Sequence, residues 1–116
     1  TQWVAEHIRQ FRGDPHRLAI GGDSAGGNLA AAVALMARDK GFPSIQRQIL
    51  IFPVLNHQFD TLSYILFANG YYLTRELMQV FWKAYLPKGL NGHHPYASPL
   101  QAPTLVHLPP ALVIVA

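Results

Sequence analysis

The 116-residue sequence contains no cysteine and has few charged residues. The absence of cysteine excludes a disulfide framework and a thiolate metal site, and it is compatible with a reducing, cytoplasmic location. Only 13% of the residues are charged and 50% are hydrophobic, whereas a typical soluble chain has about 25% charged residues. This composition predicts that other protein covers part of the surface of these residues.

Long hydrophobic runs and runs of one charge are also missing. The apolar stretches fall well short of the roughly 20 residues that a membrane span needs, and no charged and hydrophobic leader begins the chain. The nine lysine and arginine residues give a net charge of +3 but are scattered singly. The footprint of a nucleic-acid-binding protein is therefore absent. We expect a soluble protein with no membrane span and no nucleic-acid partner.

The most informative segment is glycine-rich and reads Ile-Gly-Gly-Asp-Ser-Ala-Gly-Gly-Asn over residues 20–28. Apolar residues precede it and an alanine-rich run follows it, so the local order is strand, sharp turn and helix. Residues 22–26 fit the G-x-S-x-G nucleophile elbow, in which a side chain two residues before or after the serine is expected to collide with the neighbouring strand or helix. Ser24 is the candidate nucleophile, and the predicted structural elbow consists of Gly22, Asp23, Gly26 and Gly27.

Two other kinds of glycine-rich turn do not fit this segment. A P-loop needs Lys followed by Ser or Thr after its last glycine, but Gly27 is followed by Asn28 and Leu29. The dinucleotide fingerprint G-x-G-x-x-G has no matching frame here. A purely structural turn remains the alternative to a nucleophile elbow.

The helix expected after Ser24 gives the turn an electrostatic role. Its free N–H groups and positive dipole end point at the serine oxygen. The N–H group of Ala25 is therefore predicted to be one donor of an oxyanion hole. One such donor typically stabilises the transition state by about 3 to 4 kcal/mol.

Hydrophobic periodicity predicts helices and strands around this turn. Helices are expected over residues 2–12, 25–40 and 75–85, and strands over residues 17–21, 48–54 and 111–116. Thr74 is expected to cap the helix over 75–85, which has a broad apolar face. The apolar run 48–54 is typical of a parallel strand that is covered on both faces, and together with the helix before it and the strand 17–21 it forms a βαβ unit. The predicted buried face of the helix over 25–40 consists of Leu29, Val33, Met36 and Ala37.

Residues 55–73 form a long connection that is rich in aromatic and apolar side chains. An apolar connection of this length is usually a lid or a pocket wall. Phe67 and Tyr72 are the candidate substrate-pocket residues. A short helix over residues 62–68, packed on the core, has equal weight.

The ten residues from Gly21 to Ala30 resemble the serine motif of the hormone-sensitive-lipase-like branch of the α/β-hydrolases, which are carboxylic ester hydrolases. Other segments resemble landmarks of this branch in the same order, so the resemblance covers nearly the whole chain. It implies an α/β fold in which parallel strands with flanking helices form three layers (α/β/α), and the three strands would be the fifth to seventh of eight. The further landmarks are Phe52-Pro53-Val54-Leu55, residues 70–74, Ala97-Ser98-Pro99-Leu100 and residues 108–112.

The resemblance also implies that residues 1–116 are the central part of a single domain. In the family, the second oxyanion element lies upstream of the serine, whereas the catalytic acid and histidine follow the strand that ends here at Ala116 and the strand after it. We therefore expect the isolated chain to be inactive. We also expect it to associate through exposed sheet edges or with the rest of its parent protein.

Two functions from different classes remain open. The first is a serine carboxylic ester hydrolase that cleaves small to medium acyl esters through an acyl-enzyme on Ser24. The second is a non-catalytic hydrolase-like fragment that binds a ligand or a partner. A local triad with His57 and Asp60 is a further alternative, although three residues of separation give no reason for His57 to face Ser24.

No cofactor and no metal are expected. The adjacent His93 and His94 could suggest a metal site, but no acidic or cysteine partner stands at ligand spacing. The proline and histidine content around them favours a surface loop.

Overall fold

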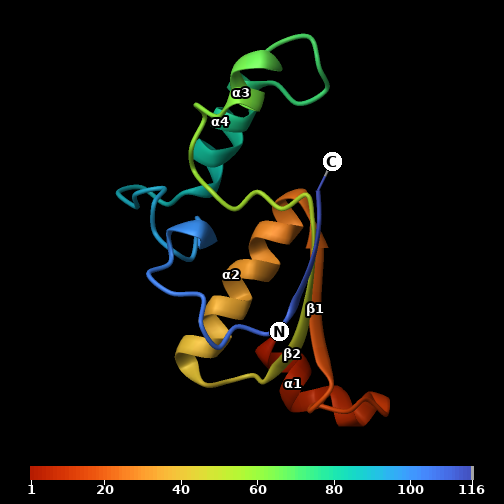
Figure 1. The fold of residues 1–116 in the computed structure, drawn as a ribbon. Helices are drawn as coiled ribbons and strands as arrows, with labels where there is room; N and C mark the ends of the chain where they lie inside the picture. Colours follow the sequence, from red (N-terminus) through yellow and green to blue (C-terminus); the bar gives the residue numbers. More distant parts are fainter. Residues whose placement is uncertain (116) are drawn as a thin grey trace.

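The computed structural model describes residues 1–115 (Figure 1). Its elements in chain order are α1 (Gln2–His7), η1 (Ile8–Phe11), β1 (Leu18–Asp23), α2 (Ser24–Lys40), β2 (Ile45–Ile51), α3 (Leu62–Leu66), α4 (Arg75–Tyr85), η2 (Pro99–Gln101) and β3 (Ala111–Ile114). The predicted helix over residues 2–12 is divided between α1 and η1, and Arg12 ends it with a φ of 62°.

The three strands form one parallel sheet in the order β1-β2-β3. In its register, Gly22 pairs with Leu50, and Leu50 pairs with Val113. The predicted βαβ unit and parallel sheet are confirmed. Because parallel strands run in one direction, their carboxyl ends meet at a single edge of the sheet, the upper edge in Figure 1.

Helix α2 packs on one face of β1 and β2. Its predicted buried face is right at Ala37, which is buried, and wrong at Leu29, which is 51% exposed, because the buried residues are mostly alanines. Ala30 and Ala31 contact Leu50, with Ile20 packed beside them. Small side chains let the helix axis approach the sheet closely, so the alanine face is buried and the larger side chains lie beside it.

Strand β2 differs from its prediction at both ends and on one face. It begins at Ile45 and ends at Ile51, because Phe52 has a φ of 34° and Pro53 carries no N–H for the sheet. Leu50 is buried under α2, but Ile49 on the opposite face is 42% exposed. Residues 1–115 therefore provide a helical layer on one face of the sheet and leave the other face open.

The apolar connection contains α3 and leads into α4. The predicted short helix is present, because α3 lies within residues 62–68, but its predicted packing on the core is wrong, since none of its residues is buried. The predicted cap of α4 is confirmed, because the Thr74 hydroxyl accepts the N–H of Leu77. Met78 and Trp82 of α4 form a second small core with Ala97. Figure 1 shows that α3 and α4 project beyond the carboxyl ends of the strands, above the start of α2.

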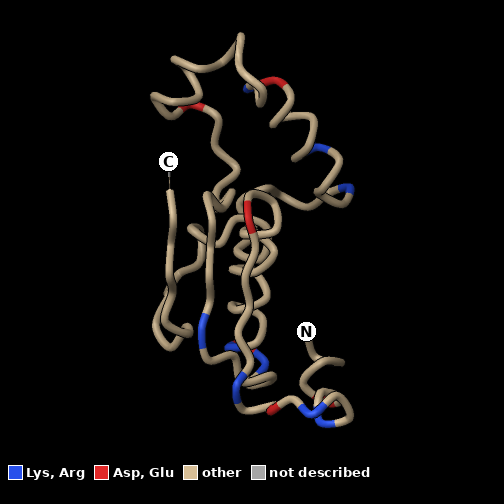
Figure 2. Tube along the Cα trace, turned by 90° about the vertical axis from the view of Figure 1, so that its right-hand side faces the viewer, with Lys and Arg blue, Asp and Glu red and all other residues tan. Residues whose placement is uncertain are grey.

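Charged side chains are unevenly distributed over the molecule. In Figure 2, most lysine and arginine residues lie at the end of the molecule remote from α4, and the middle of the sheet is nearly free of charge. Among residues 1–115, no helix combines the length and the hydrophobicity that crossing a membrane requires.

A charged cluster anchors the C-terminal half of α2. The Arg38 guanidinium donates to Asp39 at 2.8 Å and to the Thr104 carbonyl at 2.8 Å, and the Tyr96 hydroxyl donates to Asp39 at 2.8 Å. The Tyr96 hydrogen bond, followed by that of Arg38, lowers the pKa of Asp39 below its ordinary value of 3.8. The cluster ties α2 to the connection before β3.

The Tyr96→Phe variant is expected to raise the pKa of Asp39 toward its ordinary value, because the largest cause of the lowering is then removed. Since this pKa is depressed in the folded state, the stability that it contributes is present above about pH 4 and is lost as the pH falls through the folded value. A carboxyl-carbon NMR titration of Asp39 measures the shift. An unchanged pKa in Tyr96→Phe would contradict the assignment to Tyr96.

Candidate active site

Ser24 lies at the turn between β1 and α2 with a backbone φ of 51°. A residue other than glycine in this left-handed region costs about 1 to 3 kcal/mol, and such residues concentrate at functional sites. A Cβ at Gly22 would overlap the backbone carbonyl of Gly26 and lie 3.0 Å from its Cα. The backbone two residues before the serine is therefore packed as tightly as the glycine pattern predicted.

The predicted reason for glycine after the serine is wrong for Gly26. A Cβ at Gly26 would meet no atom of the described chain within 4 Å, whereas one at Gly27 would lie 2.8 Å from Cβ of Pro53. Gly27 is the position that lets the segment after β2 pass close to α2. Asp23 occupies the N-cap position of α2 in extended conformation, and its side chain makes no capping hydrogen bond within residues 1–115.

A clamp of three hydrogen bonds attaches the segment after β2 and the loop at Ala97 to α2. The Val54 N–H donates to the Ser24 carbonyl at 3.3 Å. The Asn28 amide donates to the Val54 carbonyl at 2.6 Å and to the Ala97 carbonyl at 2.7 Å. Asn28 is buried, so the clamp satisfies two backbone carbonyls away from water. Sequence reasoning missed this role, although Asn28 is the last residue of the glycine-rich segment.

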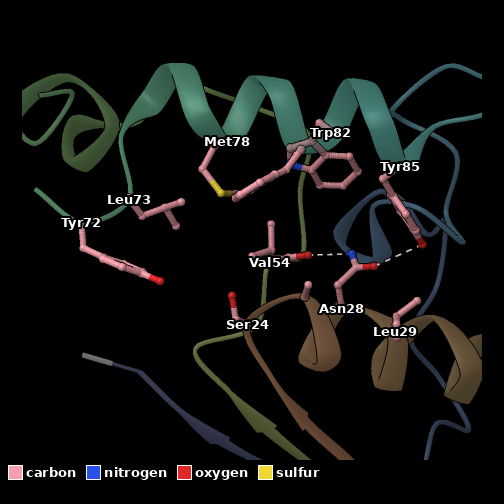
Figure 3. Close-up of a pocket in the computed structure, with 11 residues that line it drawn as sticks. Ser24, Asn28, Leu29, Val54, Tyr72, Leu73, Met78, Trp82 and Tyr85 are labelled. Atoms are coloured by element: carbon pink, nitrogen blue, oxygen red, sulfur yellow. Dashed lines mark hydrogen bonds between the residues drawn. The ribbon is translucent and has the colours of Figure 1, made fainter.

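A pocket of about 300 Å³ opens above Ser24 (Figure 3). Nearly all of its wall is apolar. Much of the wall comes from α4, whose apolar face extends beyond the two residues that form the small core with Ala97. The sequence predicted this face but not its use as a pocket wall. The lining residues are Ser24, Ala25, Asn28, Leu29, Val54, Tyr72, Leu73, Met78, Phe81, Trp82 and Tyr85.

The structure separates the two aromatic residues that the sequence assigned to the pocket. Tyr72 stands at the rim with its side chain fully exposed. Phe67 lies outside the set of residues that line the pocket in the described chain, and its ring packs edge-on against Tyr71 with centroids 5.2 Å apart.

Ala25 lines the pocket beside Ser24, in the first turn of α2. The N–H groups of a first helical turn have no partner within the helix, and the positive end of the helix dipole lies there. This arrangement can stabilise an oxyanion at Ser24.

His57 and Asp60 do not join Ser24. The His57 ring packs against Phe59 and Trp82, with centroids 5.0 and 4.9 Å away, and its backbone N–H donates to the Ser98 hydroxyl at 2.9 Å. Within residues 1–115, no hydrogen bond connects His57 or Asp60 to Ser24. The local-triad alternative therefore receives no support from the geometry.

The paired histidines lie away from the pocket. The ring of His93 faces that of His57 edge-on at 6.1 Å, and the ring nitrogen of His94 accepts the N–H of Tyr96 at 3.1 Å. In the part of the chain that the structure describes, no three His, Asp or Glu side chains gather as metal ligands.

Comparisons with known proteins agree with the geometry of the elbow. A sequence model of the alpha/beta hydrolase fold matches residues 1–116. The carboxylic ester hydrolase LipN of Mycobacterium tuberculosis is 42% identical over 120 residues, which cover 98% of this chain and 32% of LipN. The gibberellin receptor GID1B of Arabidopsis thaliana is 35% identical over 120 residues, or 98% of this chain and 33% of the receptor.

Solved structures give the same result. A thermostable esterase from Pseudomonas putida superposes with a TM-score of 0.90 at 46% identity, covering 97% of this chain and 36% of the esterase. An esterase from Pyrobaculum calidifontis has a TM-score of 0.86 at 41% identity over 96% of this chain and 37% of its own.

The chain therefore belongs to the α/β-hydrolase-fold family, and its predicted fold class is confirmed. Its resemblance to the hormone-sensitive-lipase-like branch is confirmed as well, because relatives such as LipN are carboxylic ester hydrolases. The chain spans about a third of the length of the relatives that it matches.

Proposed function

We propose that the protein containing these residues is a serine carboxylic ester hydrolase that cleaves small to medium acyl esters. The observation that carries the proposal is Ser24, held at a φ of 51° at the start of α2 and facing an apolar pocket of about 300 Å³. A serine is a weak nucleophile unless a hydrogen-bonded base activates it. The histidine and the acid of the triad then come from residues outside the described chain.

The reaction follows from this placement. The Ser24 hydroxyl loses its proton to the histidine and attacks the ester carbonyl, and the oxyanion is stabilised by the Ala25 N–H. The alcohol leaves with the proton returned by the histidine, so that an acyl-enzyme remains on Ser24. Water, deprotonated by the same histidine, then releases the acid.

Ser24 is expected to be the site of covalent labelling by a fluorophosphonate in the complete protein. The parent protein should lose its esterase activity as the label is incorporated, and Ser24→Ala should take no label. Mass spectrometry of the labelled peptide checks the residue. Absence of label in the folded parent protein, or equal labelling of Ser24→Ala, would show that the nucleophile assignment is wrong.

The second candidate is a receptor-like function, in which the protein binds a small molecule. It is supported by the similarity of the chain to a relative named as a gibberellin receptor. In that case the same apolar pocket would bind a small molecule without turnover. Binding of an ester to the complete protein with no hydrolysis and no fluorophosphonate label would support this candidate over the first.

Tyr72 is proposed to limit the acyl chain at the rim of the pocket. The Tyr72→Ala variant is expected to shift the preferred acyl length of p-nitrophenyl esters to longer chains, because removing the ring widens the pocket mouth. Phe67→Ala is the matched control, since the Phe67 ring packs on Tyr71 instead. An acyl-length profile that is unchanged in Tyr72→Ala would contradict the assignment.

A further inference from the structure

One group in the apolar pocket has unused hydrogen-bonding capacity. The Asn28 amide nitrogen binds two carbonyl oxygens, which only accept, so the orientation of the amide is determined by its partners. The Asn28 Oδ1 must therefore face the other way, toward the Tyr85 hydroxyl (Figure 3).

The contact between these two oxygens is long. The Tyr85 hydroxyl lies 3.5 Å from Asn28 Oδ1, whereas hydrogen bonds between hydroxyl and carbonyl oxygens are usually about 2.7 to 2.8 Å. An amide oxygen has two acceptor sites, so a buried acceptor is left poorly satisfied beside the pocket. A hydroxyl group that donates to Oδ1 and accepts from Tyr85 would satisfy both.

Other polar groups of the pocket do not offer the same capacity. The indole N–H of Trp82 also lacks a partner in the described chain, but it is buried out of reach of solvent and hence of a ligand. Tyr72 lies at the exposed rim. Asn28 and Tyr85 both line the pocket, and Tyr85 is 46% exposed, so a bound molecule can reach this pair.

The position of the pair relative to Ser24 sets the chemistry of its ligand. Ser24 and Asn28 are four residues apart at the start of α2, and both line the same pocket. We propose that the Asn28–Tyr85 pair is a subsite for a hydroxyl group located a few bonds from the ester carbonyl, which makes hydroxy esters the preferred substrate class. This inference rests on the proposed ester hydrolase function.

The test compares three ethyl esters on the complete protein: butanoate, 3-hydroxybutanoate and 3-methoxybutanoate. The methoxy group has a similar inductive effect but cannot donate to Asn28, so it isolates the donated hydrogen bond. On the alcohol side, 2-hydroxyethyl and 2-methoxyethyl butanoate form the corresponding pair. We expect kcat/KM to favour the hydroxy ester by about fivefold in one of these two pairs, as the gain of one neutral hydrogen bond predicts.

The Tyr85→Phe variant is expected to lower kcat/KM for the hydroxy ester relative to ethyl butanoate, because the hydroxyl that donates to the ligand oxygen is removed and the ring is kept. Tyr96→Phe is the matched control, since its hydroxyl binds Asp39 and not the pocket, and it should retain the ratio of the parent protein. Equal kcat/KM for the hydroxy and methoxy esters in both pairs would overturn the proposal. An unchanged kcat/KM ratio of the hydroxy ester to ethyl butanoate in Tyr85→Phe would do the same.

Calorimetric binding of the same esters to Ser24→Ala separates this inference from the function on which it rests. If the parent protein hydrolyses no ester but Ser24→Ala binds the hydroxy ester more tightly than the methoxy ester, the hydrolase function fails and the subsite stands. If the parent protein hydrolyses all the esters and neither measurement distinguishes hydroxy from methoxy, the subsite fails and the hydrolase function stands.

Discussion

Little or no ester hydrolysis is expected from the 116-residue chain on its own. Within residues 1–115 no histidine is hydrogen-bonded to Ser24, and losing members of a catalytic triad typically lowers the rate by about 10⁴- to 10⁶-fold. We propose that the second oxyanion donor is absent as well, which removes a further ~3 kcal/mol of transition-state stabilisation. The measurement is kcat/KM for p-nitrophenyl acetate, compared between the purified chain and the complete protein.

Association of the isolated chain is expected in the same preparation. Strands β1 and β3 are the outer strands of the sheet in the described residues, and every residue of β3 is exposed. Open edges and uncovered apolar faces favour pairing with another chain, so light scattering should show a mass above that of the monomer.

Robust hydrolysis by the isolated chain, abolished in Ser24→Ala, would contradict the prediction that the chain is inactive. The search for a base would then turn to His57, His93, His94 and His107.

The Gly22→Ala substitution is expected to abolish fluorophosphonate labelling and to lower the free energy of unfolding by about 3 kcal/mol. The Cβ of the new alanine would overlap the backbone of Gly26. Gly26 belongs to α2 and cannot move without displacing the start of that helix. The elbow would then have to open, which moves Ser24 from the pocket. Denaturant unfolding and labelling of the complete protein measure the two effects.

Gly26→Ala is the matched control for stability, because its Cβ would meet no described atom within 4 Å. Alanine inside a helix is favoured over glycine by about 1 kcal/mol, so this variant should be as stable as the parent protein or slightly more stable. Equal destabilisation by Gly22→Ala and Gly26→Ala would show that the helix propensity and the predicted overlap do not control this turn.

Local chemistry explains what the sequence predicted well. The elbow needs only a strand, a serine with glycine two residues before it, and a helix, and all of these lie within residues 18–40. The cap at Thr74 is equally local, because its hydroxyl binds an N–H three residues ahead. Short-range sterics and hydrogen bonds decide such features, so the residues themselves carry the information.

Features that depend on distant residues were predicted less well. The need for glycine at Gly27 comes from Pro53 on another segment, and the buried face of α2 is selected by the distance at which it packs on the sheet. Phe67 and Tyr72 are both aromatic residues of the apolar connection, so the sequence does not distinguish them. Only Tyr72 lines the pocket, because α3 and the turn after it orient the two rings differently. Periodicity describes which side chains are apolar and not which neighbours will cover them.

The Asn28 clamp also bears on the order in which the protein can assemble during synthesis. Asn28 binds carbonyl groups that lie 26 and 69 residues later in the chain. When α2 has been synthesised, the segments that hold the serine turn have therefore not yet been made. Contacts of such long sequence separation form late, after the cost of closing the loops between them. The nascent protein thus carries an unclamped serine turn until Ala97 has emerged, and its reactive centre matures only after most of this region has been translated.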